Sequence, residues 1–369
     1  MPYPQFDRKK IKFKPLSLRK DKVYIEKDAV YPDAEPSREL TENENEVFEY
    51  LLEQLISAKK ANKSRMLTFG AHSIKNGLAP VIMHLVENGW ITHLATNGAG
   101  IIHDWEFSYQ GHSSEDVKTN VQKGEFGIWE ETGFYLNLAI IVGAYEGRGY
   151  GESVGTFVEN EGLYIPSKEE LIEKIKDRAE AEPYYASACA DLLHAIKTFS
   201  LRDGFLKVPH LYKRFGLQAF AYRKGIPFTA HPMIGHDIIY THPMNCCSAI
   251  GRAGERDFLT FVESVYNLDG GVYLSIGSAV MSPMVFEKSL SMCQNLALQN
   301  GKPITNHLIV VVDLQESKWN WGNGEPPMSR PEYYLRFNKS FSRMGGRFFY
   351  LTMDNRDFLL HLVRRLCKI

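Results

Sequence analysis

Six short apolar runs alternate with amphipathic segments along most of the chain. Between several of these runs, hydrophobic residues recur at the three- and four-residue spacing of a helix, as at Ile82, Leu85 and Val86. Strands that alternate with helices predict an α/β fold, here a Rossmann-like, mostly parallel sheet with helices on both faces. The apolar runs are the predicted strands, at 66–69, 91–95, 226–230, 272–276, 308–312 and 347–352.

The same pattern predicts the domain organisation. Residues 1–45 form a basic and then acidic N-terminal arm, expected to be solvated or to pack on a neighbouring subunit. Because no Pro- or Ser-rich linker divides the rest, 46–369 is predicted to be one domain with a helical decoration around 167–199. Two stretches are expected to lack regular structure: 108–129 is polar and irregular, and 145–155 is a glycine-rich surface loop.

Composition narrows the class of protein. Of 369 residues, 44% are hydrophobic and the formal net charge is −1, so a general nucleic-acid binder is not indicated. No apolar run approaches the roughly 20 residues that span a bilayer, and no secretory leader is recognised. Five cysteines without CxxC spacing suggest neither a disulfide framework nor a thiolate zinc site. We therefore expect a cytoplasmic protein that does not associate with membranes.

Polar residues and glycines collect directly after the predicted strands. In open parallel sheets ligands bind outside the carboxyl ends of the strands, so these positions are the candidate site. Backbone N–H groups at the turn from Asn97 to Gly100, with a helix expected next, suit a pyrophosphate. Asp313 and Asp354 could bind a ribose hydroxyl or could cap the following turns. The set comprises His72, Ser73, Asn97, Gly98, Ala99, Gly100, 231–237, Gly277, Ser278, 313–316, Asp354 and Asn355.

Two further segments each allow two interpretations. The segment with His231, His236 and His242 could suggest a metal, but the spacing matches no familiar ligand pattern, so Asp237 is interpreted instead as a carboxylate for an ammonium group. The stretch Lys318 to Arg330 is rich in tryptophan, glycine and proline. It either lines a ligand pocket or packs a loop onto the core.

A series of ordered landmarks resembles the deoxyhypusine synthase family over most of 66–364. The most specific is Arg330-Pro331 followed, eight residues after the proline, by Lys339, which matches the spacing of the family's active-site lysine. The departures include Ile102 and His103, which stand where the family has two glutamates. The other matching landmarks are Thr96 to Asp104, Gly124 to Phe126, Ile226 to Phe228, His236-Asp237, Gly277-Ser278-Ala279 and Gln315-Glu316.

The resemblance implies a deoxyhypusine synthase-like NAD-binding fold and a transferase. In that family NAD oxidises a polyamine, and the aminoalkyl group is carried as an imine on the lysine, which here would be Lys339. The acceptor could be a small amine, as in homospermidine formation, and the family's tetramers imply a homo-oligomer. The substrate would contact Asp237, His103 and Glu316. The residues implied to bind NAD are Ser73, Asn97, Gly98, Ala99, Gly277, Ser278, Asp313, Leu314, Asp354 and Asn355.

A competing hypothesis is a non-catalytic NAD-binding or assembly protein that keeps the cleft without the polyamine chemistry. A sirtuin-like deacylase is not favoured, because the chain has no paired zinc cysteines.

Overall fold

The computed structural model of the chain describes residues 3–368 and divides them into two compact units. Unit 1 contains the residues up to Lys27, Ile101–Tyr222 and Pro232–Arg256. Unit 2 contains Asp28–Gly100, Arg223–His231 and the residues from Asp257 onward. Residues 46–369, which the sequence predicts to be one domain, are thus distributed over both units.

Unit 2 is built on a parallel sheet with the order β10-β9-β8-β2-β3-β7. All neighbouring strands run parallel, with Phe69 opposite both Thr96 and Ile276. The predicted fold class is confirmed, and each of its six strands lies at a predicted position. The strands are β2 (Arg65–Phe69), β3 (His93–Thr96), β7 (Phe228–Ala230), β8 (Val272–Ile276), β9 (Leu308–Asp313) and β10 (Arg347–Thr352).

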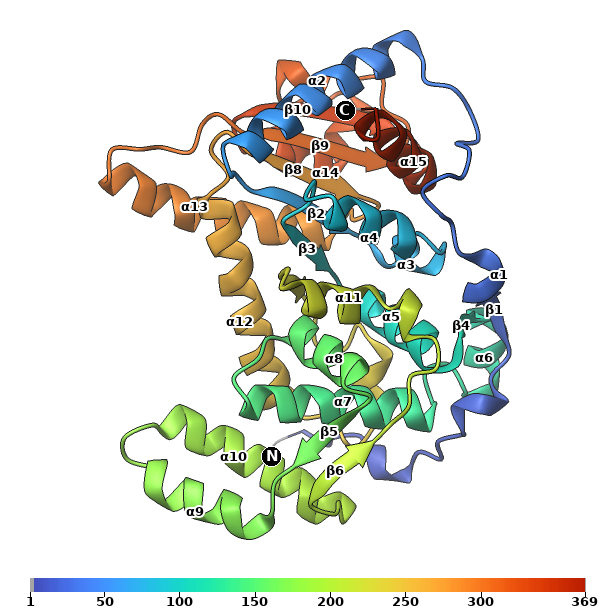
Figure 1. Cartoon of the computed structure of the whole chain (residues 1–369), viewed down its shortest axis with the longest axis vertical. Helices are drawn as coiled ribbons and strands as arrows, with labels where there is room; N and C mark the ends of the chain where they lie inside the picture. The colour runs from blue at the N-terminus through green and yellow to red at the C-terminus, as the bar shows by residue number, and fades with distance from the viewer. Residues whose placement is uncertain (1–2, 369) are drawn as a thin grey trace. The chain divides into compact units, whose positions relative to one another are not determined.

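Helices cover both faces of this sheet (Figure 1). Successive strand residues point to opposite faces, so Ile309 and Val311 join an aromatic cluster around Tyr273 and Phe286, whose rings lie 4.2 Å apart. Five of the strands, β2, β3, β7, β8 and β9, are buried at almost every position on both faces, which explains why they are nearly continuous apolar runs. The edge strand β10 is partly exposed. The helices of unit 2 are α2 (Glu42–Lys60), α3 (Ala71–Lys75), α4 (Ala79–Glu87), α13 (Met281–Gln299), α14 (Arg336–Phe341) and α15 (Asn355–Leu366), with the 3-10 turns η5 (Trp321–Asn323) and η6 (Pro331–Tyr334).

Unit 1 is mainly helical and carries two small antiparallel sheets, β1–β4 and β5–β6. Helices α5 (Gly98–Gln110), α11 (Leu217–Lys224) and α12 (Cys247–Tyr266) each begin in one unit and end in the other. Within residues 3–368, no helix has both the length and the apolar character needed to cross a membrane. The remaining elements are η1 (Arg8–Lys10), η2 (Leu16–Leu18), β1 (Asp21–Tyr24), α1 (Ile25–Asp28), β4 (His112–Glu115), α6 (Val117–Lys123), α7 (Glu130–Tyr145), α8 (Tyr150–Glu159), β5 (Gly162–Ile165), α9 (Lys168–Arg178), α10 (Pro183–Phe199), β6 (Gly204–Lys207), η3 (Lys213–Phe215) and η4 (Ile238–Thr241).

Two local predictions are wrong, and one of the two alternatives for the N-terminal arm is excluded. The stretch 108–129 contains β4 and α6. The arm is not simply solvated, because its strand β1 pairs with β4 and Arg19 is buried against Glu106, whereas its packing on a neighbouring subunit stays a prediction. The glycine-rich stretch 145–155 is not a surface loop, because α8 starts at Tyr150 and is buried. Its glycines serve close packing: a Cβ on Gly155 would lie 2.7 Å from the carbonyl oxygen of Gln218.

Alanine at Gly70 should destabilise the sheet of unit 2. The backbone of Gly70 has φ −80°, which any residue adopts, but an added Cβ would lie 2.0 Å from the carbonyl oxygen of Gly277. We expect Gly70→Ala to lower the free energy of unfolding by about 1–3 kcal/mol, the usual cost of overpacking, in urea titrations followed by circular dichroism. Gly251→Ala is the control, because Gly251 lies in α12 with no neighbour within 4 Å. Equal stability of the two variants would contradict the packing assigned to Gly70.

Candidate site at the carboxyl edge of the sheet

The order of the strands marks one place in the sheet of unit 2. Numbered along the chain, its strands stand in the order 3-2-1-4-5-6, with the reversal between β2 and β8. In open α/β sheets the ligand binds outside the carboxyl ends of the strands where the order reverses. The candidate site therefore lies above the turns that begin at Gly70 and Gly277.

These two turns pack directly on each other. The N–H of Gly70 donates to the carbonyl of Ile276 (3.0 Å), and the N–H of Gly277 donates to that of Val312 (2.9 Å), so the ladder continues past the strands. Gly277 has φ +56°, and a Cβ there would lie 2.5 Å from Nδ2 of Asn355. That amide in turn donates to Oγ of Ser73 (3.2 Å). The structure thus brings together Ser73, Gly277 and Asn355, all predicted cofactor residues.

Three other predicted residues cap the segments that follow them. The side chain of Asn97 accepts the N–H of Gly100 (2.9 Å), Asp313 accepts that of Gln315 (3.1 Å), and Asp354 accepts that of Arg356 (2.8 Å). These bonds satisfy backbone donors at turn and helix starts. Each uses one side-chain oxygen, so the capping role and a ligand contact are compatible.

Packing also requires a glycine in the turn after β3, at position 100. A Cβ on Gly100 would lie 2.2 Å from Oγ1 of Thr96, whose hydroxyl donates to the carbonyl of Phe69 (2.9 Å). Gly98 and Ala99 open α5, a helix of 13 residues. The first N–H groups of a helix have no intrahelical acceptor, and its dipole is positive at that end. This helix start is the element of the edge best suited to an anion.

The remaining cofactor candidates differ in accessibility. Ser278 is buried, and its Oγ accepts the N–H of Ser282 (3.3 Å) at the start of α13. Leu314 is 69% exposed, and Glu316, a substrate candidate in the same unit, is also exposed. Only Leu314 and Glu316 of these three have side chains open to a ligand.

A chain of hydrogen bonds leads to this edge through the core. Nδ1 of His93 lies 2.7 Å from Oγ of Ser264, and its Nε2 lies 3.0 Å from Oγ1 of Thr229. The same threonine oxygen lies 3.1 Å from Nε2 of His231, the residue that follows β7. The N–H of His231 donates to the carbonyl of Thr96 (2.9 Å), so the chain ends beside Asn97.

Burial keeps both rings of this relay neutral. Desolvation lowers the pKa of His93 and of His231 to about 3. Each neutral ring has one N–H, and the Thr229 hydroxyl can donate to only one ring nitrogen, so all protons along the chain point the same way. If every hydrogen bond of the chain reverses, one proton is in effect transferred between the hydroxyl of Ser264 and Nδ1 of His231. This Nδ1 has no hydrogen-bond partner within residues 3–368. Sequence reasoning missed this relay, although it placed His231 after a strand.

Lys339 lies on α14, over one face of the sheet. The ring of Phe337 is 6.0 Å from that of Tyr350, and Phe341 is 6.3 Å from Phe348, so these two side chains face the sheet. Nζ of Lys339 is 4.0 Å from the carboxylate of Glu325 and 3.7 Å from the ring centre of Tyr333. Both neighbours stabilise a positive charge.

Two predicted substrate residues belong to unit 1. Oδ2 of Asp237 is buried without a hydrogen-bond partner in residues 3–368, and burial raises the pKa of this carboxyl to about 6. Nδ1 of His103 lies 2.7 Å from Oγ of Ser113. No group of three or more His, Cys, Asp or Glu in the described chain could hold a metal ion.

No family model matches the sequence, and no curated protein matches it either. Several solved structures are distantly similar in fold. A conserved LOR/SDH protein from Methanococcus maripaludis S2 has 14% identity and a TM-score of 0.40, with 91% of this chain and 71% of that chain covered.

AgrE, solved in a ternary complex with ornithine and NAD+, has 13% identity and a TM-score of 0.43, with 90% of this chain and 34% of that chain covered. ArgZ, an arginine dihydrolase from the ornithine-ammonia cycle in cyanobacteria, has 15% identity and a TM-score of 0.39, with coverage of 88% and 33%. This chain therefore spans about a third of the length of these two proteins. The similarity is one of fold at a distance and assigns no chemistry.

The relay predicts the titration of two histidines. Because the pKa of each ring is lowered from 6.5 to about 3, His93 and His231 should stay neutral between pH 7 and 5. Long-range proton–nitrogen NMR spectra should show fixed tautomers across this range. In the unfolded chain both rings take up protons near pH 6.5, whereas in the folded chain they do not. The free energy of unfolding should therefore decrease as the pH falls below 6.5, by up to about 1.4 kcal/mol per ring and pH unit.

Protonation of His93 or His231 between pH 7 and 5 would contradict the relay.

Proposed function

We propose that the chain binds NAD at the carboxyl edge of the unit 2 sheet. The strand order carries this proposal, because the reversal between β2 and β8 is where dinucleotides bind in sheets of this order. Positions predicted from the sequence for NAD, among them Ser73, Gly277 and Asn355, lie together at that reversal.

The chemical groups at this edge match the parts of NAD. The first N–H groups of α5, at Gly98 and Ala99, suit the pyrophosphate. The uncapped oxygens of Asp313 and Asp354 suit ribose hydroxyls, as acidic residues at strand ends do in dinucleotide sites. Leu314 offers exposed apolar surface for a base. Bound NAD would supply a hydride acceptor and later a hydride donor.

We further propose that the reaction transfers an aminoalkyl group, as the resemblance to deoxyhypusine synthases implies. Hydride loss from the carbon beside an amine nitrogen gives an iminium ion. The neutral amine of Lys339 would add to that carbon and expel the first amine, which forms a lysine imine. The acceptor amine would displace Lys339 in turn, and return of the hydride would give the new secondary amine with no net oxidation. Lys339 must first lose a proton and its contact with Glu325.

His231 supports the proton transfers in this scheme. It lies at the edge where NAD is proposed to bind, and burial keeps its ring neutral. A ring with so low a pKa does not take up a proton in a separate step, so the transfer would have to be concerted. As Nδ1 receives a proton from an amine bound at this edge, Nε2 would pass one through Thr229 and His93 to Ser264, whose own hydroxyl proton would leave to solvent.

A second function is favoured by one observation. The amine of Lys339 lies between the carboxylate of Glu325 and the ring of Tyr333, an environment that suits a permanent ammonium. If Lys339 keeps its charge, the chain is an NAD-binding protein without transferase activity, and the cleft serves regulation or assembly.

Ala99→Asp should weaken NAD binding without harming the fold. A carboxylate in the first turn of α5 is favoured by the helix dipole but repels a pyrophosphate bound there. We expect the dissociation constant for NAD, measured by isothermal titration calorimetry, to rise by at least about tenfold, with the melting temperature unchanged or higher. Ala99→Asn, similar in size and uncharged, is the matched control and should bind within a few-fold of the wild type. Equal binding by both variants would place the pyrophosphate elsewhere.

Reductive trapping tests the lysine imine. With NAD and a polyamine such as spermidine, sodium borohydride should fix an aminoalkyl adduct on Lys339, detected by peptide mass spectrometry. Lys339→Arg keeps the charge beside Glu325 and Tyr333 but cannot form an imine, so it should bind NAD normally and give no adduct. NAD binding by the wild type with no adduct on Lys339 would reject the transferase and leave the non-catalytic function.

A further inference from the structure

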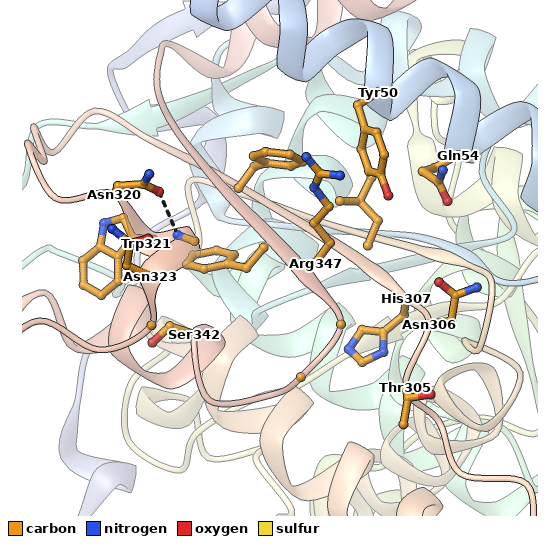
Figure 2. A pocket seen from close by; sticks show the side chains of 17 residues that line it. Tyr50, Gln54, Thr305, Asn306, His307, Asn320, Trp321, Asn323, Ser342 and Arg347 are labelled. Atoms are coloured by element: carbon orange, nitrogen blue, oxygen red, sulfur yellow. Dashed lines mark hydrogen bonds between the residues drawn. The ribbon is translucent and has the colours of Figure 1, made fainter.

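A cavity of about 690 Å³ lies in unit 2 at the amino edge of the sheet, opposite the strand ends described above (Figure 2). Its lining comes from the segments that lead into β9 and β10, from the loop around η5, and from two side chains of α2, Tyr50 and Gln54. Cavities of this size hold small metabolites. The first strand residues, Leu308 and Arg347, lie in the lining, so this cavity is separate from the strand ends proposed for NAD.

Arg347 is the one charged side chain in this lining. Its guanidinium carbon is 4.1 Å from the ring centre of Tyr50 and 4.9 Å from that of Phe349, so two aromatic rings hold it. Figure 2 shows the guanidinium beside the Tyr50 ring. Within residues 3–368 it has no carboxylate partner and no hydrogen bond. An arginine fixed by aromatic contacts keeps its fork of N–H donors available.

The rest of the lining adds donors and no negative charge. None of the 17 lining residues is acidic. Gly345 and Gly346 have φ +69° and +67°, and their N–H groups have no backbone partner in the described chain. Asp269 lies near this wall, and its Oδ1 accepts the N–H groups of Thr305 (2.9 Å) and Asn306 (2.8 Å).

We propose that this cavity is a second ligand site, which binds a small metabolite carrying a phosphate or carboxylate group. The oxyanion would bind to the guanidinium of Arg347 in a bidentate manner and to the glycine N–H groups beside it. The amides of Gln54, Asn306 and Asn323 would bind hydroxyl or amide groups of the rest of the ligand. No carboxylate is available in the lining to accept an amine, so the ligand differs in charge from the proposed amine substrate.

His307 adds a neutral group to the same wall. It is 3% exposed, and burial lowers its pKa. Neither ring nitrogen makes a well-formed hydrogen bond with a described residue. Its ring lies against Gly346, where a Cβ would be 2.8 Å from Nε2. A neutral imidazole offers one donor and one acceptor, which suits a hydroxyl of the ligand.

Binding of simple oxyanions to the whole protein tests the proposal. Inorganic phosphate, glycerol 3-phosphate and succinate should each be titrated by calorimetry, because phosphate and carboxylate ligands share the chemistry of Arg347 and only the comparison separates them. Arg347→Gln should weaken the tightest of the three by at least about tenfold. Arg347→Lys keeps the charge without the fork and should bind with intermediate affinity. Arg343→Gln is the control, because Arg343 is exposed and paired with Glu325 (2.5 Å).

The Ala99→Asp variant separates this site from the proposed NAD site. Oxyanion binding that survives Ala99→Asp and is lost in Arg347→Gln supports the proposal, even if NAD does not bind at all. Oxyanion binding that is lost in Ala99→Asp and kept in Arg347→Gln would assign the anion to the carboxyl edge and overturn it. Failure of all three ligands to bind the wild type at millimolar concentration would also overturn it.

Discussion

The contact between the turns after β2 and β8 is the constraint on which the carboxyl edge depends. The two strands are neighbours at the point where the strand order reverses, and the N–H of Gly70, just after β2, donates to the last residue of β8. Only glycine at position 70 lets the Gly277 carbonyl approach, and only glycine at 277 leaves room for the amide of Asn355. Ser73 and the start of α15 are positioned by that amide. A group of predicted cofactor residues is therefore held together by packing.

A parallel sheet gives unit 2 two edges of different chemistry. At the carboxyl edge, helix starts present N–H groups, and the carboxylates of Asp313 and Asp354 are partly used as caps. At the amino edge, the segments entering β9 and β10 place an arginine between two rings. Beside it lie the N–H groups of Gly345 and Gly346, which have no backbone partner among residues 3–368. Because neighbouring strands run parallel, the residues that follow the strands lie at the carboxyl edge, and the residues that precede them lie at the amino edge. Two ligand sites can then form with no shared residue.

Much of this architecture could be predicted from the sequence, because strands buried on both faces are uniformly apolar and the turns after them are rich in glycine. The strand order could not, since pairing is set by tertiary contacts that no local pattern records. The relay depends on β3 lying beside β7, so His93 and Thr229 look like isolated polar residues in apolar runs. Gly155 suggested a loop because its packing partner, α11, is distant in sequence. The resemblance to deoxyhypusine synthases singles out Lys339, but no local pattern predicts that Glu325 and Tyr333 are its neighbours.

The proposed chemistry would need the two histidines of the relay and Lys339, and their surroundings favour opposite charge states. His93 and His231 are neutral because desolvation outweighs any stabilisation of their charged forms, whereas Lys339 has an acidic and an aromatic neighbour that favour its charge. A neutral relay can move a proton without leaving a charge in the core, where an unpaired charge is costly. In the proposed scheme, release of Lys339 from Glu325 would separate opposite charges, whereas proton transfer along the relay would not.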